Sequence, residues 1–438
     1  MKPKANICLL KRDLRVEDNR TLYQCYMNSE KILPIFVFDK DVLKSVGIEE
    51  LSDHRLSFLL DIIENLRKQI KLYVFVGNDQ EAISRIIERY DIKALYTSKP
   101  LTFSGKHRNQ KIKEFLKYRG IQMIEVLDNV LCDYTKIPYR KVYTYFYNEW
   151  KNYLDLEMVK DVDYNTKIIH DEFLEDLTRI SIQQVKSKIK NTTIWTYEFG
   201  INRIKEYDFS KYEELRNDLG IDYSSKLSPY IRFGVLSIRK VYNLAKDKSI
   251  GFIKELAWRE FWYHIAHYFP ELPNLEFQER RRNIAWENNE KYIDSIEKAQ
   301  TGYPIIDACI IQLKRENWMH NRARLIFGSF LTKDLLTDWR IGEKIFSKYL
   351  IDYDEVVNLG NWQWISSVGP DPKPLRIFNP ILQAQKFDPF SKFIKKYLPQ
   401  LSNMEPHKLH DPLSNKLNYY PPIVNHHERI EKIKQAYS

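Results

Sequence analysis

Two segments in the last third of the chain, residues 318–324 and 352–364, set polar and aromatic side chains within apolar surroundings. The second segment carries two carboxylates and an amide, at Asp352, Asp354 and Asn358. Such groups suit the polar edge of a buried planar ligand, although acidic and amide residues are also common helix caps. The first segment, continued to residue 328, places four residues on one face if it is a helix. They are an amide, a cation, an apolar residue and a glycine: Asn321, Arg324, Leu325 and Gly328.

A second set of reactive side chains lies at helical spacing in residues 255–262. One helix face there carries a carboxylate, a guanidinium and two indoles: Glu255, Arg259, Trp258 and Trp262. This combination suits flat bases with hydrogen-bonding edges. An aromatic stripe is more often core, yet a Glu and an Arg within a dry core are costly unless they are paired.

A hydroxyl-rich run just before a predicted helix is a candidate phosphate site. It consists of Ser224, Ser225, Lys226, Leu227 and Ser228. Hydroxyls, a lysine and helix-start amides suit a pyrophosphate. A simple N-cap explains these residues equally well, so both interpretations stay open on this run alone.

The elements that must position these residues fall into three parts. Residues 1–130 alternate short β-rich runs with amphipathic stretches, which predicts a doubly wound parallel α/β sheet. No GxGxxG turn follows the first strand, which argues against a dinucleotide dehydrogenase. Residues 131–194 read as a polar linker, and 195–438 as an almost entirely helical domain. The expected strands cover residues 7–10, 33–38, 72–76, 94–96 and 123–127, with helices over 54–69 and 79–89.

Composition narrows the possible partners and compartment. The formal net charge of +10 favours a polyanion such as nucleic acid, although a lysine-rich proteome is the alternative. The four cysteines lie far apart without disulfide, zinc or iron–sulfur spacing, which predicts reduced thiols in a cytoplasmic protein and no metal. The sequence contains no apolar run of membrane-spanning length and predicts no signal peptide.

Together with these segments, several further motifs resemble the photolyase/cryptochrome flavoproteins over nearly the whole chain. They stand in the family's order and at its spacings, and the match is closest to class I cyclobutane pyrimidine dimer (CPD) photolyases. The resemblance implies an antenna domain followed by a helical FAD-binding domain. The additional motifs are Lys11–Asn19, Pro138–Thr144, Leu227–Gly234, Thr301–Ala308 and Arg376–Pro380.

The resemblance implies a FAD site with reduced FAD as the active form. Ser224 departs mildly from the Thr often found in the family, but it keeps the hydroxyl. Asn358 matches the photolyase choice, whereas plant cryptochromes have Asp and animal ones Cys at that position. The residues that match cofactor contacts are Tyr212, Ser224, Ser225, Lys226, Leu227, Ser228, Arg259, Arg324, Asp352, Asp354 and Asn358.

The resemblance also implies a flipped-out pyrimidine dimer in UV-damaged DNA as the substrate. Leu325 replaces the Met usual in dimer-repairing relatives, and the single His320 lacks the partner His typical of 6-4 photolyases. The matching dimer and DNA contacts are Glu255, Trp258, Trp262, Asn321, Arg322, Leu325, Trp364 and Arg376.

The expected chemistry is electron transfer from excited reduced FAD to the dimer. Glu255 and Asn358 are the candidates for electrostatic roles, and Trp286, Trp339 and Trp362 match the family's tryptophan chain. A second antenna chromophore (folate, deazaflavin, FMN or FAD) and a monomeric state are also expected. The rivals are a blue-light photoreceptor without repair activity, a 6-4 photolyase, and a nucleic-acid-binding protein without cofactor.

Overall fold

The computed structural model describes residues 2–39, 53–370, 375–414 and 418–438, and the chain separates into two compact units. Each unit is assembled from three separate stretches of sequence. The first unit comprises Met1–Lys136, Trp150–Tyr207 and Ser225–Lys248; the second comprises Ile137–Glu149, Asp208–Ser224 and Ser249–Ser438. The three-part division expected from the sequence stays a prediction.

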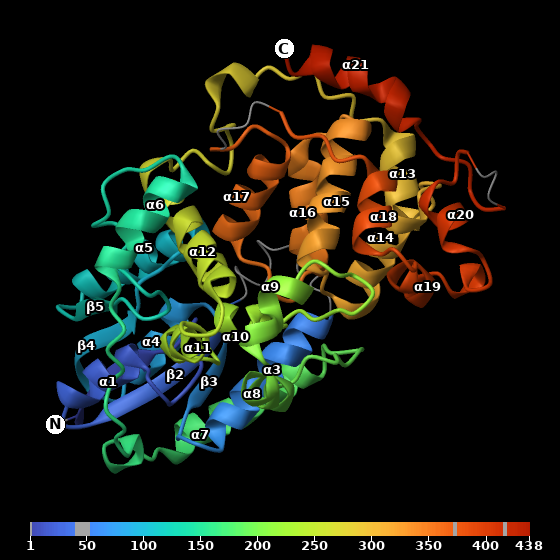
Figure 1. The fold of residues 1–438 in the computed structure, drawn as a ribbon. Coiled ribbons are helices and arrows are strands. Elements are labelled where there is room, and N and C mark those ends of the chain that lie inside the picture. Colours follow the sequence, from blue (N-terminus) through green and yellow to red (C-terminus); the bar gives the residue numbers. More distant parts are fainter. Residues whose placement is uncertain (1, 40–52, 371–374, 415–417) are drawn as a thin grey trace. The chain divides into compact units, whose positions relative to one another are not determined.

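The first unit contains a five-stranded parallel sheet of order β3-β2-β1-β4-β5 (Figure 1). This confirms the doubly wound sheet predicted from the alternating pattern. Its strands are β1 (Lys4–Leu9), β2 (Ile32–Asp39), β3 (Tyr73–Gly77), β4 (Asp91–Ser98) and β5 (Gln122–Val126). Its helices are α1 (Arg20–Met27), α3 (Asp53–Arg67), α4 (Asp79–Ile87), α5 (Phe103–Lys117), α7 (Glu172–Lys186), α8 (Tyr197–Glu206), α10 (Ser228–Arg232) and α11 (Ile238–Ala245).

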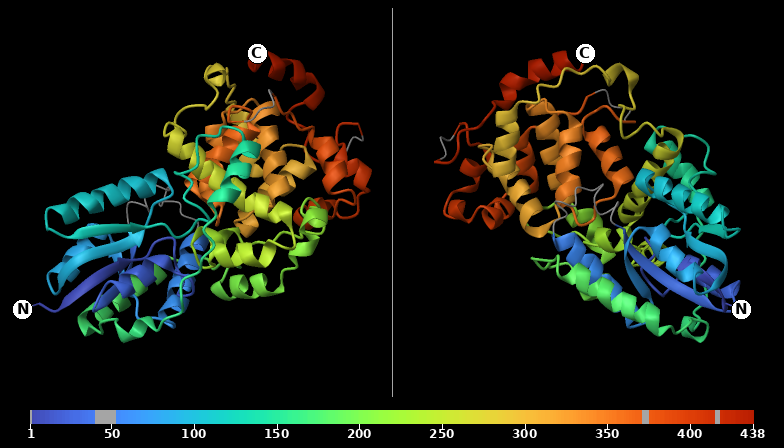
Figure 2. Two further views of the ribbon diagram at one scale, coloured as in Figure 1. Left: turned by 60° about the vertical axis from the view of Figure 1, so that its left-hand side comes forward. Right: turned by 180° about the vertical axis from the view of Figure 1, so that it is seen from behind.

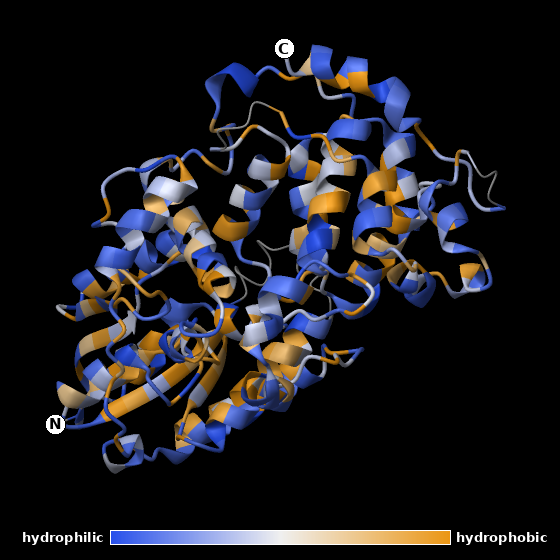
Figure 3. Cartoon of the chain, viewed as in Figure 1, coloured by the Kyte–Doolittle hydropathy of each residue, from blue (hydrophilic) through white to orange (hydrophobic). Residues whose placement is uncertain are grey.

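Apolar strands form the core of this unit and appear as hydrophobic ribbons in Figure 3. All eight residues of β2 are buried, as expected for an inner strand of a parallel sheet whose faces carry helices. Three helices bring Ile86, Ile112 and Leu174 to the same core cluster. The continuous apolar runs that identified the strands are therefore the runs that need burial on both faces.

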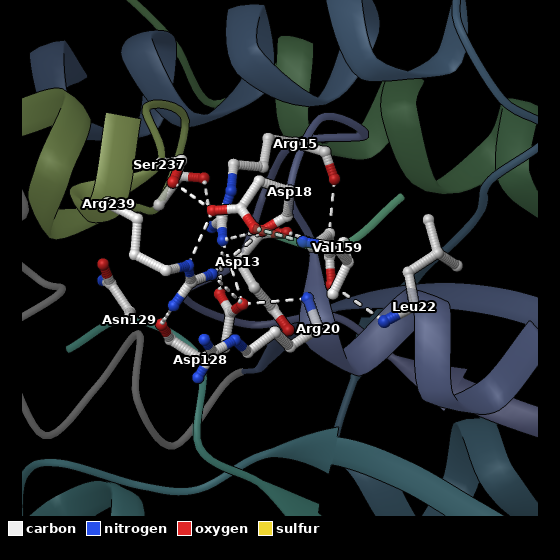
Figure 4. A network of polar contacts seen from close by, with 12 residues as sticks. Asp13, Arg15, Asp18, Arg20, Leu22, Asp128, Asn129, Val159, Ser237 and Arg239 are labelled. Carbon is white, nitrogen blue, oxygen red and sulfur yellow. Dashed lines mark hydrogen bonds and ion pairs between the residues drawn. The ribbon is translucent and has the colours of Figure 1, made fainter. Parts of the chain in front are cut away.

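A buried ion-pair network joins the loop after β1, the segment after β5 and the start of α11 (Figure 4). Arg239 Nε lies 2.7 Å from Asp18 Oδ2, and its Nη2 lies 3.2 Å from Asp128. Arg15 pairs with the same Asp128 at 2.8 Å. Since the Arg239, Asp18 and Asp128 side chains have no exposed surface, their charges must compensate one another. The Lys11–Asn19 motif thus contributes to tertiary structure in the first unit.

The second unit is helical (Figure 2). Within it α17 packs against α12, α15 and α16, so four helices position most of the predicted site. The helices are α6 (Tyr143–Trp150), α9 (Tyr212–Leu215), α12 (Ile250–Tyr268), α13 (Glu290–Lys298), α14 (Pro304–Glu316), α15 (Asn321–Ser329), a π-helix (Phe330–Asp334), α16 (Trp339–Tyr349), α17 (Glu355–Ile365), α18 (Pro380–Phe387), α19 (Lys392–Tyr397), α20 (Pro406–His410) and α21 (His426–Ala436).

Candidate functional site

The start of α17 holds the two predicted carboxylates in different ways. Asp354 is the N-cap, with Oδ1 accepting from the Val357 amide, and its Oδ2 accepts from the Tyr263 hydroxyl at 2.7 Å. Asp352 accepts a 2.8 Å hydrogen bond from Arg324 on α15. Both carboxylates are buried, so the capping role of Asp354 coexists with a place in the interior. Arg324 and Asp352, both predicted cofactor contacts, thus form an ion pair.

One turn further along α17, Asn358 is oriented by the half-buried Glu343 on α16. Its Nδ2 donates to Glu343 Oε1 at 3.2 Å, and the same oxygen accepts from the Tyr353 hydroxyl at 2.8 Å. Burial raises the pKa of Glu343 above its ordinary value, partly offset by these two donors. Because the amide nitrogen faces Glu343, the Asn358 oxygen points away from it and can accept a hydrogen bond elsewhere.

The predicted stripe on α12 divides between a buried and an accessible part. Trp262 is buried against α17, where an added Cβ at Gly360 would lie 2.3 Å from its ring. Glycine at position 360 therefore permits the close approach of the two helices. Trp258, one turn earlier, is only half-buried, and Arg259 lies over the Tyr263 ring at 5.0 Å.

Glu255 at the start of the stripe is paired with an arginine that the sequence reasoning missed. Arg216 Nη2 lies 2.6 Å from Glu255 Oε1, and the two side chains are 23% and 34% exposed. Arg216 also lies over the Tyr212 ring, four residues earlier, at 5.0 Å. The i, i+4 spacing from Tyr212 is the one signal that could have pointed to Arg216.

On α15, the predicted substrate residues lie at or near the helix start. His320 is the N-cap, Asn321 is exposed and Leu325 is half-buried. Arg322 donates to Asn217 Oδ1 at 2.7 Å and lies 4.1 Å above the Phe387 ring. Burial and, secondarily, the nearby Arg216 lower the pKa of Arg322 to about 10.

The predicted phosphate segment is divided between the two units. Ser224 belongs to the second unit, where its hydroxyl donates to Asp222 Oδ1 at 2.9 Å. Ser225, Lys226, Leu227 and Ser228 belong to the first. Lys226 adopts a positive φ of 56°, and Ser228 begins α10.

The three predicted chain tryptophans lie on neighbouring segments of the second unit. Trp362 on α17 contacts α16 at Gly342, which shares a helix face with Trp339 one turn earlier. Trp339 is fully buried and donates to Glu276 Oε1 at 3.2 Å. Trp286 is half-buried, and the residue after it donates its amide hydrogen to the Leu336 carbonyl oxygen, three positions before Trp339.

Trp364 and Arg376, the two remaining predicted residues, contact each other. The Arg376 guanidinium lies 4.5 Å from the Trp364 ring centroid, and the Trp364 and Trp258 ring centroids lie 6.4 Å apart with their planes inclined by 71°. The structure therefore connects this cation to the half-buried Trp258 of α12 through Trp364.

Comparisons with known families identify this arrangement. The family described as DNA photolyase matches residues 6–163, and the FAD binding domain of DNA photolyase matches residues 252–438. The chain belongs to the DNA photolyase family. The second match covers Arg259, Arg324 and the whole of α17.

Relatives of this photolyase-family enzyme align over nearly its full length. The deoxyribodipyrimidine photo-lyase of Synechococcus sp. is 32% identical over 98% of this chain and 95% of its own. The deoxyribodipyrimidine photo-lyase of Alkalihalophilus pseudofirmus is 31% identical over 96% of this chain and 95% of its own. An archaeal photolyase from Sulfolobus tokodaii, solved with two FAD molecules, has a TM-score of 0.89 at 29% identity and 99% coverage of both chains. A Synechocystis cryptochrome at 24% identity shares the fold, with a TM-score of 0.85.

The side chains around α17 fit FAD. Both donors and acceptors for a polar-edged ring are present: the Arg324–Asp352 pair, the Asp354 carboxylate and the Asn358 oxygen that faces away from Glu343. The buried indole N–H of Trp362, one turn after Asn358, has no hydrogen-bond partner within the described residues. Among the residues that the structure covers, no helix is long and apolar enough to cross a membrane.

Proposed function

We propose that this enzyme repairs cyclobutane pyrimidine dimers in UV-damaged DNA by light-driven electron transfer. One observation carries the proposal. On α12, Glu255 and Trp258 are accessible, while Trp262 on the same face is buried against α17, the helix of Asn358. A carboxylate and an indole suited to a flipped base thus lie one helix away from the proposed flavin contacts. The relatives named deoxyribodipyrimidine photo-lyase support it.

The proposed cofactor contacts are the side chains around α17. Bound FAD supplies light absorption and the electron. Asp352 and Asp354 accept hydrogen bonds from the cofactor's N–H groups, Arg324 balances the charge of Asp352, and Asn358 presents its oxygen because Glu343 holds its nitrogen. Further proposed contacts, by family resemblance, are Tyr212, Ser224, Ser225, Lys226, Leu227, Ser228 and Arg259.

The proposed lesion contacts begin at Glu255. Its Oε1 pairs with Arg216, so Oε2 is the acceptor for the polar edge of the dimer. Trp258 stacks against a dimer ring, while Asn321 and Leu325 complete the wall from α15. Further proposed contacts are Trp262 and Trp364 with the dimer, and Arg322 and Arg376 with DNA phosphates.

Trp286, Trp339 and Trp362 form the proposed route by which the flavin is photoreduced. The burial of the three indoles supports this route. Trp286 is half-buried and can receive an electron from an external donor, whereas Trp339 and Trp362 are shielded from solvent. The proposal further includes a second, light-harvesting chromophore, a monomeric state and a cytoplasmic location. Extraction of the bound chromophores and light scattering test the chromophore and the monomer.

The decisive experiment illuminates photoreduced enzyme with an oligonucleotide that contains one thymine cyclobutane dimer. Return of thymine absorbance in blue light, and not in the dark, is the expected result. A parallel oligonucleotide with one 6-4 photoproduct should stay unchanged. A persistent cyclobutane dimer despite fully reduced FAD would refute the proposal. The Glu255→Gln variant should retain FAD and repair more slowly, because the amide keeps the shape of the carboxylate but loses its charge.

A further inference from the structure

The accessible tryptophan of α12 is covered on one face by a tyrosine from a distant segment. The Trp258 and Tyr143 rings stack with centroids 3.7 Å apart and planes 3° from parallel. The Trp364 ring plane is inclined to the indole by 71°, and the Phe261 ring plane by 87°. Among the aromatic rings in the described part of the chain, Tyr143 is thus the only one that stacks face to face on Trp258.

Tyr143 is itself held at several points. Its hydroxyl donates to the carbonyl oxygen of Lys254 at 2.8 Å, one helical turn before Trp258. Its ring centroid lies 5.8 Å from that of Phe261, with the planes 86° apart, and 5.9 Å from that of Tyr147, with the planes 22° from parallel. Burial, followed by the charge of Glu255, raises the pKa of Tyr143 well above its ordinary value, so the phenol stays protonated as a donor.

This arrangement restricts Trp258 before any substrate binds. An indole stacked against a ring that is itself packed against Phe261 and Tyr147 has lost most of its rotamer freedom. Trp258 therefore loses little further side-chain entropy when a base stacks on it. Because Tyr143 covers one face of the indole, a base can stack only on the opposite face.

We propose that Tyr143 is a positioning residue that holds Trp258 in the orientation in which the indole stacks against a flipped pyrimidine dimer. This inference rests on the proposed function. It assigns a role to the Pro138–Thr144 motif, which the structure places in the second unit.

The test compares Tyr143→Leu, which removes the stack, with Tyr143→Phe, which keeps the ring. Tyr147→Leu is the matched control, because it removes the next ring of the same stack without uncovering Trp258. The probes are an oligonucleotide with one thymine cyclobutane dimer and its undamaged counterpart. The flavin spectrum and the thermal unfolding midpoint identify variants that have lost their fold.

Tyr143→Leu should weaken dimer binding by about 2- to 12-fold, the range for ordering one side chain on binding. Binding of undamaged DNA and repair yield at saturation should stay unchanged, and Tyr143→Phe should bind the dimer like the wild type. Equal dimer affinity in Tyr143→Leu and wild type would overturn the inference, as would equal losses on both oligonucleotides. A wild type that does not prefer the dimer would instead refute the proposed function.

If Tyr143→Leu unfolds, Tyr143→Phe and Tyr143→His decide the question, because both keep a planar ring and only Phe lacks a polar atom. Positioning by stacking is supported if dimer affinity decreases with the area of the ring at position 143, so that Tyr143→Phe binds more tightly than Tyr143→His. Dimer affinity lost with the hydroxyl alone would overturn it.

Discussion

Replacing Gly342 by alanine should displace the buried Trp362 ring. An ideal Cβ at position 342 would lie 2.2 Å from Trp362 Cη2 and 2.4 Å from its Cζ3. Carbon atoms prefer about 3.5–4 Å, so the ring must move by more than about 1 Å. Phe346 and Phe327 pack against the same indole at 4.9 and 6.2 Å and oppose that movement.

Two opposing terms set the stability of Gly342→Ala. Alanine gains about 1 kcal/mol of helix propensity over glycine. Overpacking a rigid core costs about 1–3 kcal/mol, and the upper end applies because the obstacle is an indole ring and not a flexible chain end. The net loss in the free energy of unfolding should therefore be about 2 kcal/mol, measured by urea denaturation.

Gly328→Ala on α15 is the matched control. Its Cβ would lie 3.0 Å from Ile365 Cγ2 and 3.6 Å from Trp362 Cζ3, so a small shift of one methyl group accommodates it. We expect a change within about 1 kcal/mol of the wild type. Gly342→Ala should also slow flavin photoreduction by an external reductant, followed by flavin absorbance, whereas Gly328→Ala should leave it nearly unchanged. A Gly342→Ala enzyme with wild-type stability and photoreduction would refute the reasoning.

Three further changes test other parts of the structure. Glu343→Gln should speed reoxidation of reduced flavin in air, because a glutamine can turn either its oxygen or its NH2 group toward Asn358 and so no longer fixes the orientation of the Asn358 amide. An unchanged reoxidation rate would argue against the orienting role of Glu343. Arg239→Met should cost about 3–5 kcal/mol of unfolding free energy in urea, because buried Asp18 loses this cation while buried Asp128 keeps only Arg15; a loss below about 1 kcal/mol would contradict this. Burial raises the pKa of Asp307 to about 6, so the folded state binds this proton more tightly than the unfolded state does. As the pH rises from about 4 to 6, the unfolding free energy of the wild type should therefore fall, relative to that of Asp307→Asn, by about 1.4 kcal/mol per pH unit. A difference between the two proteins that does not change with pH would contradict the raised pKa.

The sheet could be predicted because its signal is local. The apolar runs at residues 33–38 and 72–76 became β2 and β3 with bounds shifted by one residue at each end. A buried parallel strand needs apolar side chains on both faces, so its sequence is apolar throughout. The same holds for the helical spacing of residues 255–262, which lies entirely within α12.

The site was only partly predictable, because helical spacing shows which side chains share a face but not what covers that face. Trp258 and Trp262 look equivalent in the sequence, yet one is half-buried and the other is buried against Gly360. Family resemblance named Asn358 and Asp354 individually. Neither that resemblance nor the spacing showed the donor from Tyr263 to Asp354.

The sequence by itself determined the strands, the helix faces and the types of group available for chemistry, since these depend on residues within a few positions of one another. Only the tertiary structure decided how those groups are oriented. Glu343 turns the amide of Asn358 from 15 residues away, and Arg216 pairs with Glu255 across 39 residues. Such contacts arise when helices pack, and packing depends on the shape of every neighbouring side chain at once, which no local pattern encodes.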